Sequence, residues 1–449
     1  MPRGMFLGYL CCSAEELFSW RYERDFHMRL ILFDCDTANR IKFHPLALSR
    51  PIWELRTGMS SLADKLIAKT GAAQVSCFVP PYMAEAYRQR TDWPVNDLTA
   101  LSDGDLLIIN PRVRAESFHL PDEGPSQVGM SADGEMLWAR VCAEDAARLN
   151  RGSIDHFLSD ATGKLPNVSA GLPTWDYTWD LLLANGEQLT ADFAARGRSG
   201  IEGTVEQPNA LRGGEKDIYV APGARIHPMV VLDATDGPIY IDEGAEVQPF
   251  TRIEGPCYVG RGTILLGAKC RAGTSIGPVC RVGGEVEESI ILGYSNKYHD
   301  GFLGHAYVGE WVNLGALTSN SDLKNDYSNV TVVLDGESSV NTGTMKLGAM
   351  IADHTKTAIG VLLKTGAYVG GMSMIVGTGG PLTKFLPAFT WLADGVLSEH
   401  PDKDRLYKTA KTSMERRGCC WTAAEQAMWD EIYLRTAPHR KMAVERSKG

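Results

Sequence analysis

Two histidines, His299 and His305, lie six residues apart where a regular six-residue pattern of aliphatic residues is interrupted, from Ser289 to His305. Transfer of an acyl group from a thioester to an amine requires a base that takes the amine proton near neutral pH, and an imidazole has that property. Insertions in repetitive folds are also places where binding surfaces form. Each histidine is therefore a candidate general base, although a single histidine more often has a structural role.

A second group of chemically capable residues is cationic and follows the first predicted strand. Guanidinium and ammonium groups pair with phosphate oxygens, so these residues could form a pocket for a nucleotide or a sugar phosphate. The group comprises Arg40, Arg50, Arg56 and Lys65. The alternative is that they are surface residues on the rim of a sheet, and the sequence leaves both possibilities open.

The elements around these cations alternate between strand and helix. Short apolar runs predict buried strands at residues 29–34, 73–79 and 105–110. Between the first two, the spacing of apolar residues from Ser60 to Thr70 predicts a helix, and two further segments, 154–158 and 175–185, have helical character. This order indicates an open α/β sheet, which we assign to residues 28–196. The glycine-rich, polar stretch 197–217 is then a linker.

The elements around the histidines follow a different period. Aliphatic residues recur every six positions, at Val220 and Ile226 and again at Ile241, Val247, Ile253 and Val259. This period suits a triangular coil with one short strand on each side and an aliphatic residue pointing inward. A β-sandwich would instead need alternating strands and hairpin turns. We therefore predict a left-handed parallel β-helix over residues 218–395 with a helical tail, 396–449. Residues 1–27 are expected to be a disordered extension.

The overall composition limits the class of partner. The chain of 449 residues has 45 basic and 55 acidic residues, and it lacks the basic excess that nucleic acid demands. Its ten cysteines show no CxxC or Cys/His metal spacing, which fits a reducing cytoplasm. No apolar run approaches the roughly 18 residues of a membrane span. We expect a cytoplasmic protein that binds neither nucleic acid nor membrane, with no dedicated metal ligands.

The segment His299-Asp-Gly-Phe-Leu-Gly-His-Ala-Tyr-Val-Gly-Glu-Trp-Val-Asn-Leu-Gly-Ala316 resembles the acetyltransferase part of the GlmU family. That family comprises bifunctional glucosamine-1-phosphate acetyltransferases and N-acetylglucosamine-1-phosphate uridyltransferases. The resemblance implies that His299 is the catalytic base, that Phe302 replaces a substrate-contacting tyrosine without its hydroxyl, and that Asn313 contacts the sugar. An alternate GlmU-like subfamily is more similar still, through the segments 293–304, 320–327, 353–357 and 387–391. The similarity also implies acetyl-CoA as co-substrate and a homotrimer with acyl sites between neighbouring prisms.

Residues on later coils extend this candidate site. Asn320, Asp322 and Lys324 could hold sugar hydroxyls and a phosphate, although a solvated loop explains them equally well. Four other residues are expected to bind the arm and phosphates of CoA, namely His354, Lys356, Gly370 and Gly371. Glycine at the last two positions is equally explained by turns.

The resemblance also covers the N-terminal part, from Met28 onward. Arg40 and the stretch 45–51 are similar to phosphate-binding features of sugar nucleotidyltransferases, but the glycine-rich loop is missing. Asn110 stands where that family usually has a metal-binding aspartate, so Mg²⁺ is expected only if this domain is active. Three hypotheses remain: an acetyltransferase that also transfers a nucleotidyl group, a nucleotidyltransferase with a regulatory β-helix, and a scaffold that binds nucleotide sugars.

Overall fold

The computed structural model describes residues 28–34, 38–102, 104–120, 123–377 and 382–448. The predicted extension 1–27 lies outside these residues. The chain forms two compact units: one is built on Leu66–Pro173, with residues 28–34 and Met414–Met428, and the other on Thr174–Ser413, with residues 38–65 and 429–448. The segment 28–196, predicted as one domain, is thus divided between the two units.

The first unit contains a mixed six-stranded sheet in the order β4-β1-β5-β7-β6-β8. Its strands are β1 (Arg29–Phe33), β4 (Val75–Phe78), β5 (Leu106–Ile109), β6 (Gln127–Met130), β7 (Met136–Val141) and β8 (Asn167–Ser169). The three predicted strands are the parallel group β4-β1-β5, in which the aliphatic runs of β1 and β5 and the residues Ser76–Phe78 of β4 are buried. The short helices α2 (Ala84–Tyr87) and α3 (Ala143–Ala146) and the longer α4 (Ile154–Lys164) complete the unit, while α1 (Leu62–Thr70) spans the boundary between the units.

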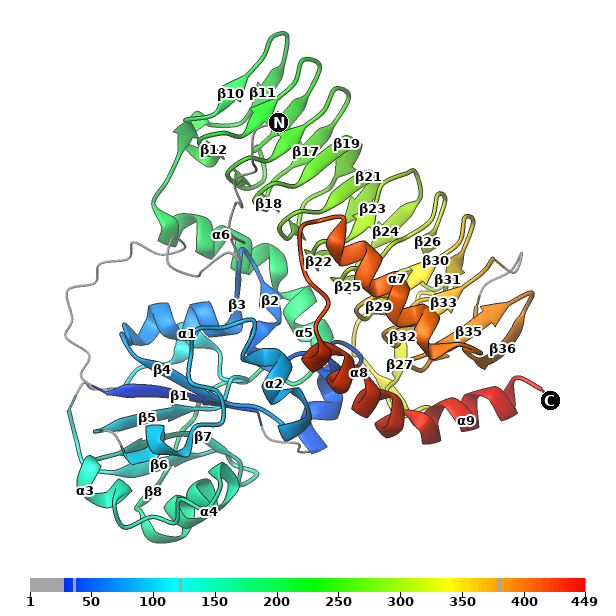
Figure 1. The fold of residues 1–449 in the computed structure, drawn as a ribbon. Helices are drawn as coiled ribbons and strands as arrows, with labels where there is room; N and C mark the ends of the chain where they lie inside the picture. Colours follow the sequence, from blue (N-terminus) through cyan, green and yellow to red (C-terminus); the bar gives the residue numbers. More distant parts are fainter. Residues whose placement is uncertain (1–27, 35–37, 103, 121–122, 378–381, 449) are drawn as a thin grey trace, which may run out of the picture. The chain divides into compact units, whose positions relative to one another are not determined.

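The second unit is a parallel β-helix whose coils stack one on another (Figure 1). One face is a ten-stranded parallel sheet with one strand per coil: β9 (Gly200–Ile201), β12 (Ile218–Val220), β15 (Ile239–Ile241), β18 (Cys257–Val259), β20 (Thr274–Ile276), β22 (Ile290–Gly293), β25 (Tyr307–Glu310), β29 (Met350–Ile351), β32 (Tyr368–Val369) and β34 (Phe385–Leu386). Ile239 pairs with Cys257, and this separation of 18 residues is three times the six-residue period. The predicted fold class is confirmed.

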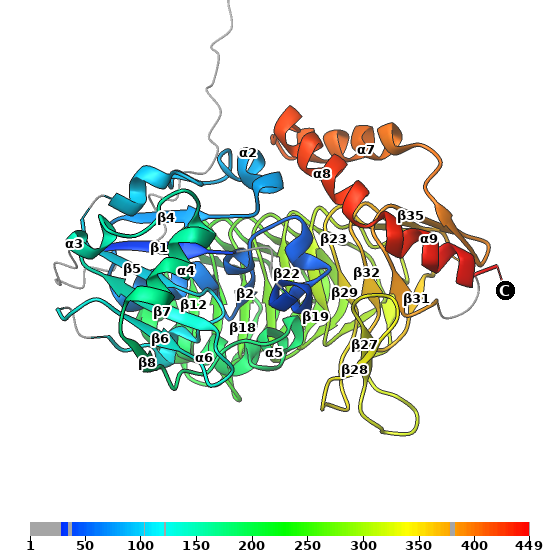
Figure 2. The ribbon, with the colours of Figure 1, turned by 90° about the horizontal axis from the view of Figure 1, so that it is seen from below.

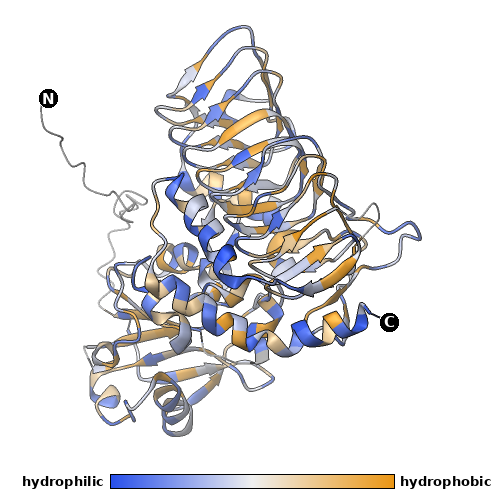
Figure 3. Ribbon diagram, turned by 45° about the vertical axis from the view of Figure 1, so that its right-hand side comes forward, coloured by the Kyte–Doolittle hydropathy of each residue, from blue (hydrophilic) through white to orange (hydrophobic). Residues whose placement is uncertain are grey.

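The other two faces follow the same stacking. The second face carries β10 (Thr204–Val205), β13 (Arg225–Ile226), β16 (Glu246–Val247), β23 (Asn296–Lys297), β30 (Lys356–Thr357), β33 (Met374–Ile375), β35 (Thr390–Ala393) and β36 (Val396–Glu399). The third carries β11 (Ala210–Arg212), β14 (Val231–Asp233), β17 (Arg252–Glu254), β24 (Phe302–Gly304), β26 (Ser319–Asn320) and β31 (Leu362–Leu363). The long strands β19 (Ile264–Cys270) and β21 (Arg281–Glu287) turn a corner and contribute to both faces. Inward-pointing aliphatic residues of all three faces form one continuous core, visible as hydrophobic segments along the coils in Figure 3.

The predicted linker 197–217 instead forms the first coil. Its strands β9, β10 and β11 pair in parallel with β12, β13 and β14 of the next coil. A terminal coil has a neighbour on one side only, so its sequence is more polar than that of an internal coil. This is why composition alone suggested a linker.

The predicted interruption at residues 289–305 is wrong, because β22, β23 and β24 make a complete coil there. The real insertion comes later. Tyr307 of β25 pairs with Met350 of β29, 43 residues away, and the intervening chain leaves the coils as the hairpin of β27 (Thr331–Val333) and β28 (Ser339–Asn341) (Figure 2). The histidines therefore lie at corners of a regular coil.

The remaining elements of the second unit cover the β-helix. Residues 38–61 form three short 3-10 helices, at Ala38–Phe43, Leu46–Leu48 and Ile52–Glu54, and the small ladder of β2 (Arg56–Thr57) and β3 (Ser60–Ser61). Helices α5 (Thr178–Leu183) and α6 (Asn185–Arg196) precede the first coil, and Gly197 ends α6 in the left-handed conformation. The predicted helical tail consists of α7 (Lys403–Glu415), α8 (Ala423–Arg435) and α9 (Ala437–Arg446), of which Met414–Met428 belongs to the first unit.

Candidate active site

His299 lies at the open corner between β23 and β24. Its side chain is exposed and makes an edge contact with the ring of Tyr298, with 4.9 Å between the ring centroids. The imidazole lines a cavity of about 390 Å³ whose other walls include Asp300 and Leu317. Because the ring is open to the solvent side of this corner, its nitrogens are accessible to a substrate amine.

The backbone of this corner is fixed from inside the coil by Lys297. The Lys297 ammonium is buried and donates hydrogen bonds to the carbonyl oxygens of Gly283, at 2.9 Å, and of His299, at 3.1 Å. Gly284 permits this arrangement, because a Cβ atom there would lie 2.7 Å from the Lys297 Nζ. Burial lowers the pKa of Lys297 to about 8. Sequence reasoning missed this residue, since nothing in its spacing shows that it points inward.

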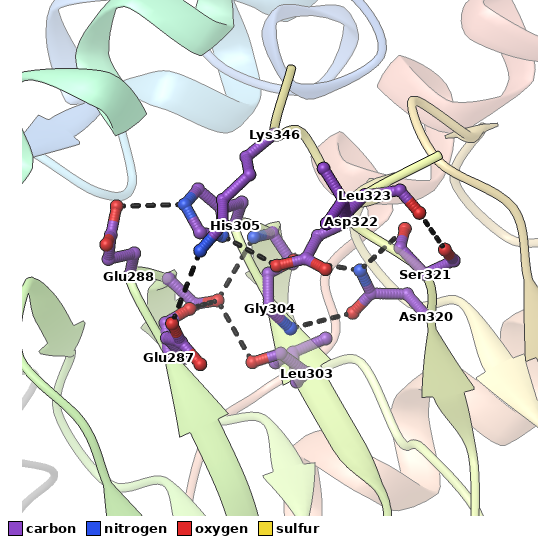
Figure 4. A network of polar contacts seen from close by, with 12 residues as sticks. Glu287, Glu288, Leu303, Gly304, His305, Asn320, Ser321, Asp322, Leu323 and Lys346 are labelled. Carbon is purple, nitrogen blue, oxygen red and sulfur yellow. Dashed lines mark hydrogen bonds and ion pairs between the residues drawn. The ribbon is translucent and has the colours of Figure 1, made fainter. Parts of the chain in front are cut away.

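His305 occupies the next corner of the same coil in a different environment (Figure 4). Its ring is buried, with Nδ1 2.8 Å from Asp322 Oδ2 and Nε2 2.9 Å from Glu288 Oε2. Burial opposes the charged form, but the hydrogen bonds to Asp322 and Glu288 outweigh it and raise the pKa of His305 to about 9. At neutral pH both nitrogens are therefore protonated donors, and this imidazole has no lone pair with which to accept a proton.

The predicted substrate-binding residues fall into two groups. Asn320 and Asp322 are used inside the coil: Asn320 donates to the Gly304 carbonyl oxygen at 2.8 Å and accepts from the Gly304 N–H at 3.0 Å, while Asp322 holds His305. Asn313 is half-buried, and its Oδ1 accepts from Asn296 at 3.2 Å. These contacts position the coil that carries both histidines.

Phe302 and Lys324 face a second, larger cavity of about 710 Å³ on the third face of the β-helix, and Asn320 lines the same cavity. Two further lysines, Lys364 and Lys384, line the same cavity. Sequence reasoning did not select them, because they stand 40 and 60 residues after Lys324, on other coils. The structure thus brings Phe302 and Lys324 together and leaves His299 at the neighbouring corner cavity.

The residues expected to bind CoA lie beneath the tail of the same unit. The His354 ring is buried, parallel to Trp311 at 6.2 Å and edge-on to Trp429 at 5.7 Å between centroids. A Cβ atom on Gly371 would lie 2.7 Å from the Trp429 ring, and one on Gly370 2.2 Å from the Ala388 nitrogen.

Lys356 is held in the same region. It donates to the Trp311 carbonyl oxygen, and burial lowers its pKa to about 8. His354, Gly370 and Gly371 are buried in this unit, and Lys356 is half-buried. Their proposed role in cofactor binding would require the tail to move.

The four N-terminal cations lie in the second unit, where each has an intramolecular partner. Arg50 is buried and pairs with Asp353 at 2.6 Å and Glu310 at 3.3 Å, and these carboxylates raise its pKa although burial opposes this. Arg40 donates to the carbonyl oxygens of Ala47, at 2.7 Å, and of Arg50, at 3.0 Å. The structure therefore brings Arg40 and Arg50 together in a buried position, where Arg50 fixes this segment to Asp353 of the β-helix.

The other two cations are also engaged. The Arg56 guanidinium donates to the Met59 carbonyl oxygen at 2.6 Å and lies 5.5 Å from the centroid of the Tyr258 ring, while Lys65 forms an ion pair with Asp192. These contacts do not form a shared pocket with Arg40 and Arg50. The alternative, in which these cations are surface residues on the rim of a sheet, does not hold for Arg40 and Arg50, because both are buried.

The expected metal position is in the first unit. Asn110 follows β5 and donates to Glu135 Oε1 at 2.9 Å, while Arg112 approaches the same carboxylate at 2.6 Å. Two donors therefore already engage the Glu135 carboxylate, and this arrangement of an amide and a guanidinium does not fit Mg²⁺, which prefers oxygen ligands. Within the part of the chain that the structure describes, no group of three or more His, Cys, Asp or Glu side chains could hold a metal ion, and no helix could span a membrane.

Comparison with known proteins links this arrangement to sugar nucleotide enzymes. Residues 30–199 match the family model of the sugar nucleotidyl transferases. The chain is 34% identical over 150 residues to a bifunctional sugar-1-phosphate nucleotidylyltransferase/acetyltransferase of Sulfurisphaera tokodaii, a match that covers 31% of this chain and 35% of that protein. It is 32% identical over 178 residues to the bifunctional protein GlmU of Cupriavidus pinatubonensis, over 39% of this chain and 34% of that protein.

Each of these matches spans about a third of the relative's length. Among solved structures, the chain is similar to the UDP-N-acetylglucosamine O-acyltransferase LpxA of Moraxella catarrhalis, with 10% identity, 56% of this chain and 94% of that chain covered, and a TM-score of 0.18, which supports no inference. The chain thus combines two parts, an α/β part that is similar to sugar nucleotidyl transferases and a parallel β-helix, and this combination defines its fold class. The matches show that parts of the chain are similar to sugar nucleotidyl transferases and to bifunctional GlmU proteins, at modest identity.

Proposed function

We propose that this chain is a GlmU-like transferase that acetylates an amino-sugar 1-phosphate from acetyl-CoA, with His299 as the general base. The observation that carries the proposal is the contrast between the two histidines of one coil. The His299 ring is exposed at a cavity, whereas both nitrogens of His305 are held by carboxylates. Of these two rings, that of His299 is the one whose nitrogens are not held by carboxylates, so it is the one placed to take a proton from a substrate amine.

In the proposed reaction the sugar amine attacks the acetyl carbonyl carbon. His299 takes the amine proton as the new C–N bond forms. The C–S bond then breaks, and the leaving sulfur takes that proton from His299, so that CoA departs as the thiol and the imidazole is neutral again. Lys297 holds the backbone carbonyl of His299 and so fixes the corner from which the ring extends. Phe302 and Lys324 are the proposed contacts for the sugar and its phosphate, because both line the larger cavity on the third face of the β-helix. Asn313 is the proposed contact for a sugar hydroxyl.

A homotrimer in the cytoplasm is the proposed state of the protein. Apolar side chains at one corner of successive coils are exposed, as at Met229, Phe250, Leu317 and Ile359. Leu317 also lines the His299 cavity, so a neighbouring chain packed against this corner would complete the site. A strictly monomeric protein in light scattering at micromolar concentration would remove the support for sites between chains.

Nucleotidyl transfer is a second proposed activity, favoured by the family match over residues 30–199. Because the surroundings of Asn110 do not fit Mg²⁺, we derive no step through that ion. The test of both activities is one assay of purified protein with acetyl-CoA and a panel of amino-sugar phosphates, run with and without nucleoside triphosphate and Mg²⁺. Acetylation without nucleotide supports the first proposal. No acetylated product from any amino-sugar phosphate would contradict it.

A further inference from the structure

The larger cavity on the third face of the β-helix is lined by three lysines from separate parts of the chain. Lys324 comes from the insertion after β26, Lys364 follows β31, and Lys384 precedes β34. The cavity has a volume of about 710 Å³, within the range of roughly 300–1,000 Å³ typical of small-molecule sites. Residues up to 60 positions apart are thus brought to one concave surface.

The charge of this cavity is strongly unbalanced. Among the described residues that line it, Asp326 is the only acid, and it lies 3.7 Å from Lys324. Lys384 donates to the carbonyl and hydroxyl oxygens of Thr331, at 3.0 and 3.3 Å, which are uncharged acceptors. Lys364 is exposed. The three ammonium groups together therefore exceed the negative charge available to them.

The lysines also act on one another. Burial lowers the pKa of Lys384, and the nearby charges of Lys324 and Lys364 lower it further. This like-charge repulsion would be relieved by an anion placed between the three ammonium groups. The cavity is also lined by three large apolar side chains, those of Phe302, Leu323 and Leu362. Such a surface suits the carbon face of a sugar ring or another apolar part of a ligand.

We propose that Lys324, Lys364 and Lys384 form a binding site for the phosphate group of a substrate, with the remainder of that substrate against Phe302. The phosphate site itself is inferred from the cavity. The identity of the ligand that carries the phosphate, either the amino-sugar phosphate or CoA, rests on the proposed function. Lysine serves a phosphate as a point charge, so three of them can surround one anion without the fixed geometry that arginine imposes. The site thus assigns a role to two lysines, Lys364 and Lys384, outside the motif that carries the family resemblance.

The test is calorimetric titration of the full chain with inorganic phosphate, glucosamine 1-phosphate, glucosamine, CoA and dephospho-CoA. The variants are Lys364→Gln and Lys384→Gln, and the control is Lys408→Gln, which removes one charge from an exposed position of α7 outside the cavity. Each cavity variant should weaken binding of the phosphorylated ligand about 10- to 100-fold, the effect expected for one charge-assisted contact. The control should bind as the wild type does.

The arms of this titration separate the two sources. Weaker binding of glucosamine 1-phosphate, with binding of glucosamine unchanged, identifies the sugar phosphate; a loss for CoA but not for dephospho-CoA identifies the cofactor. Equal affinities of the wild type and both cavity variants for every phosphorylated ligand would overturn the proposal. Lys364 is exposed, so its variant should keep the wild-type thermal transition even if the Lys384 variant does not. Binding without acetylation would refute the proposed function and leave the phosphate site intact.

Discussion

Two corners of one coil carry the two histidines, and their surroundings are opposite. At the first corner His299 extends toward an open cavity, whereas at the second His305 is buried between Glu288 and Asp322. The same contrast separates the cations, since Arg50 is buried against Asp353 while Lys364 is exposed. A residue type therefore does not fix a role. Groups whose charges are satisfied inside the coil should govern stability, and groups that face a cavity should govern binding and rate.

The largest effect on stability should come from Arg50, because this cation and its partner Asp353 are both buried. Replacing it as Arg50→Met leaves the buried Asp353 carboxylate without its cation, although Ser49 Oγ and the Glu310 N–H still donate to it at 2.6 and 2.7 Å. Removing one partner of a buried pair costs roughly 3–5 kcal/mol of unfolding free energy. Chemical denaturation measures it. Arg225→Met is the control, because the Arg225 side chain is 58% exposed and its pair with Glu206 contributes about 1 kcal/mol or less.

The buried histidine predicts a pH dependence of stability. The folded pKa of His305 is about 9, above its ordinary value of 6.5, so the folded state keeps a proton that the unfolded state has lost. The stabilisation is therefore complete below pH 6.5 and disappears as the pH rises to about 9, an effect of roughly 2–3 kcal/mol.

The difference between the wild type and His305→Gln isolates this term. Lys297 and Lys356, whose pKa values of about 8 are lowered by burial, titrate in the same range with the opposite sign, and subtraction removes their contribution. Denaturation curves at pH 6, 7.5 and 9 suffice. A difference that does not shrink with pH would mean that His305 is uncharged in the folded protein.

Asn320 should have a smaller structural effect. Its amide satisfies both the N–H and the carbonyl oxygen of Gly304, and Asn320→Ala leaves both groups buried without these partners. The cost should be about 1–3 kcal/mol. Thermal unfolding monitored by circular dichroism measures it. A variant as stable as the wild type would show that Asn320 is free to serve a substrate instead.

Lys324 should show the smallest effect on stability and a clear one on binding. Its side chain is one-third exposed, and its contacts are with Ser328 and Asp326 of the same loop. Lys324→Ala should change the unfolding free energy by less than about 0.5 kcal/mol. If the lysine holds the sugar phosphate in both ground and transition states, KM rises while kcat stays nearly constant. Steady-state kinetics with varied sugar phosphate decides this, and an unchanged KM would remove the assignment.

Local features of the fold were predictable from the sequence. The six-residue period predicted the coils, because each short strand of a coil must place one aliphatic residue in the core. The apolar runs predicted the strands β4, β1 and β5. The first coil was not recognisable, since a terminal coil is polar. The sequence also did not predict which histidine is exposed and which is buried. The burial of His305 depends on its contacts with Glu288 and Asp322, which come from neighbouring coils.

Long-range packing explains the remaining differences. The contact between Arg50 and Asp353 joins residues 303 positions apart, and Trp429 of the tail covers His354 and Gly371. Such contacts leave no local pattern, so a cation that stabilises the fold and a cation that binds phosphate look alike in sequence. Lys364 and Lys384 became candidates only when the coils placed them beside Lys324.

The most direct measurement is kcat for acetyl transfer in His299→Ala and His305→Gln, compared with the wild type at neutral pH. An accessible general base contributes ~10²- to 10⁴-fold in rate, so kcat of His299→Ala should fall by that factor with its thermal transition unchanged. His305→Gln should keep a kcat within about tenfold of the wild type and lose stability instead. The reverse pattern, with a large loss of kcat in a stable His305→Gln and little loss in His299→Ala, would contradict the assignment.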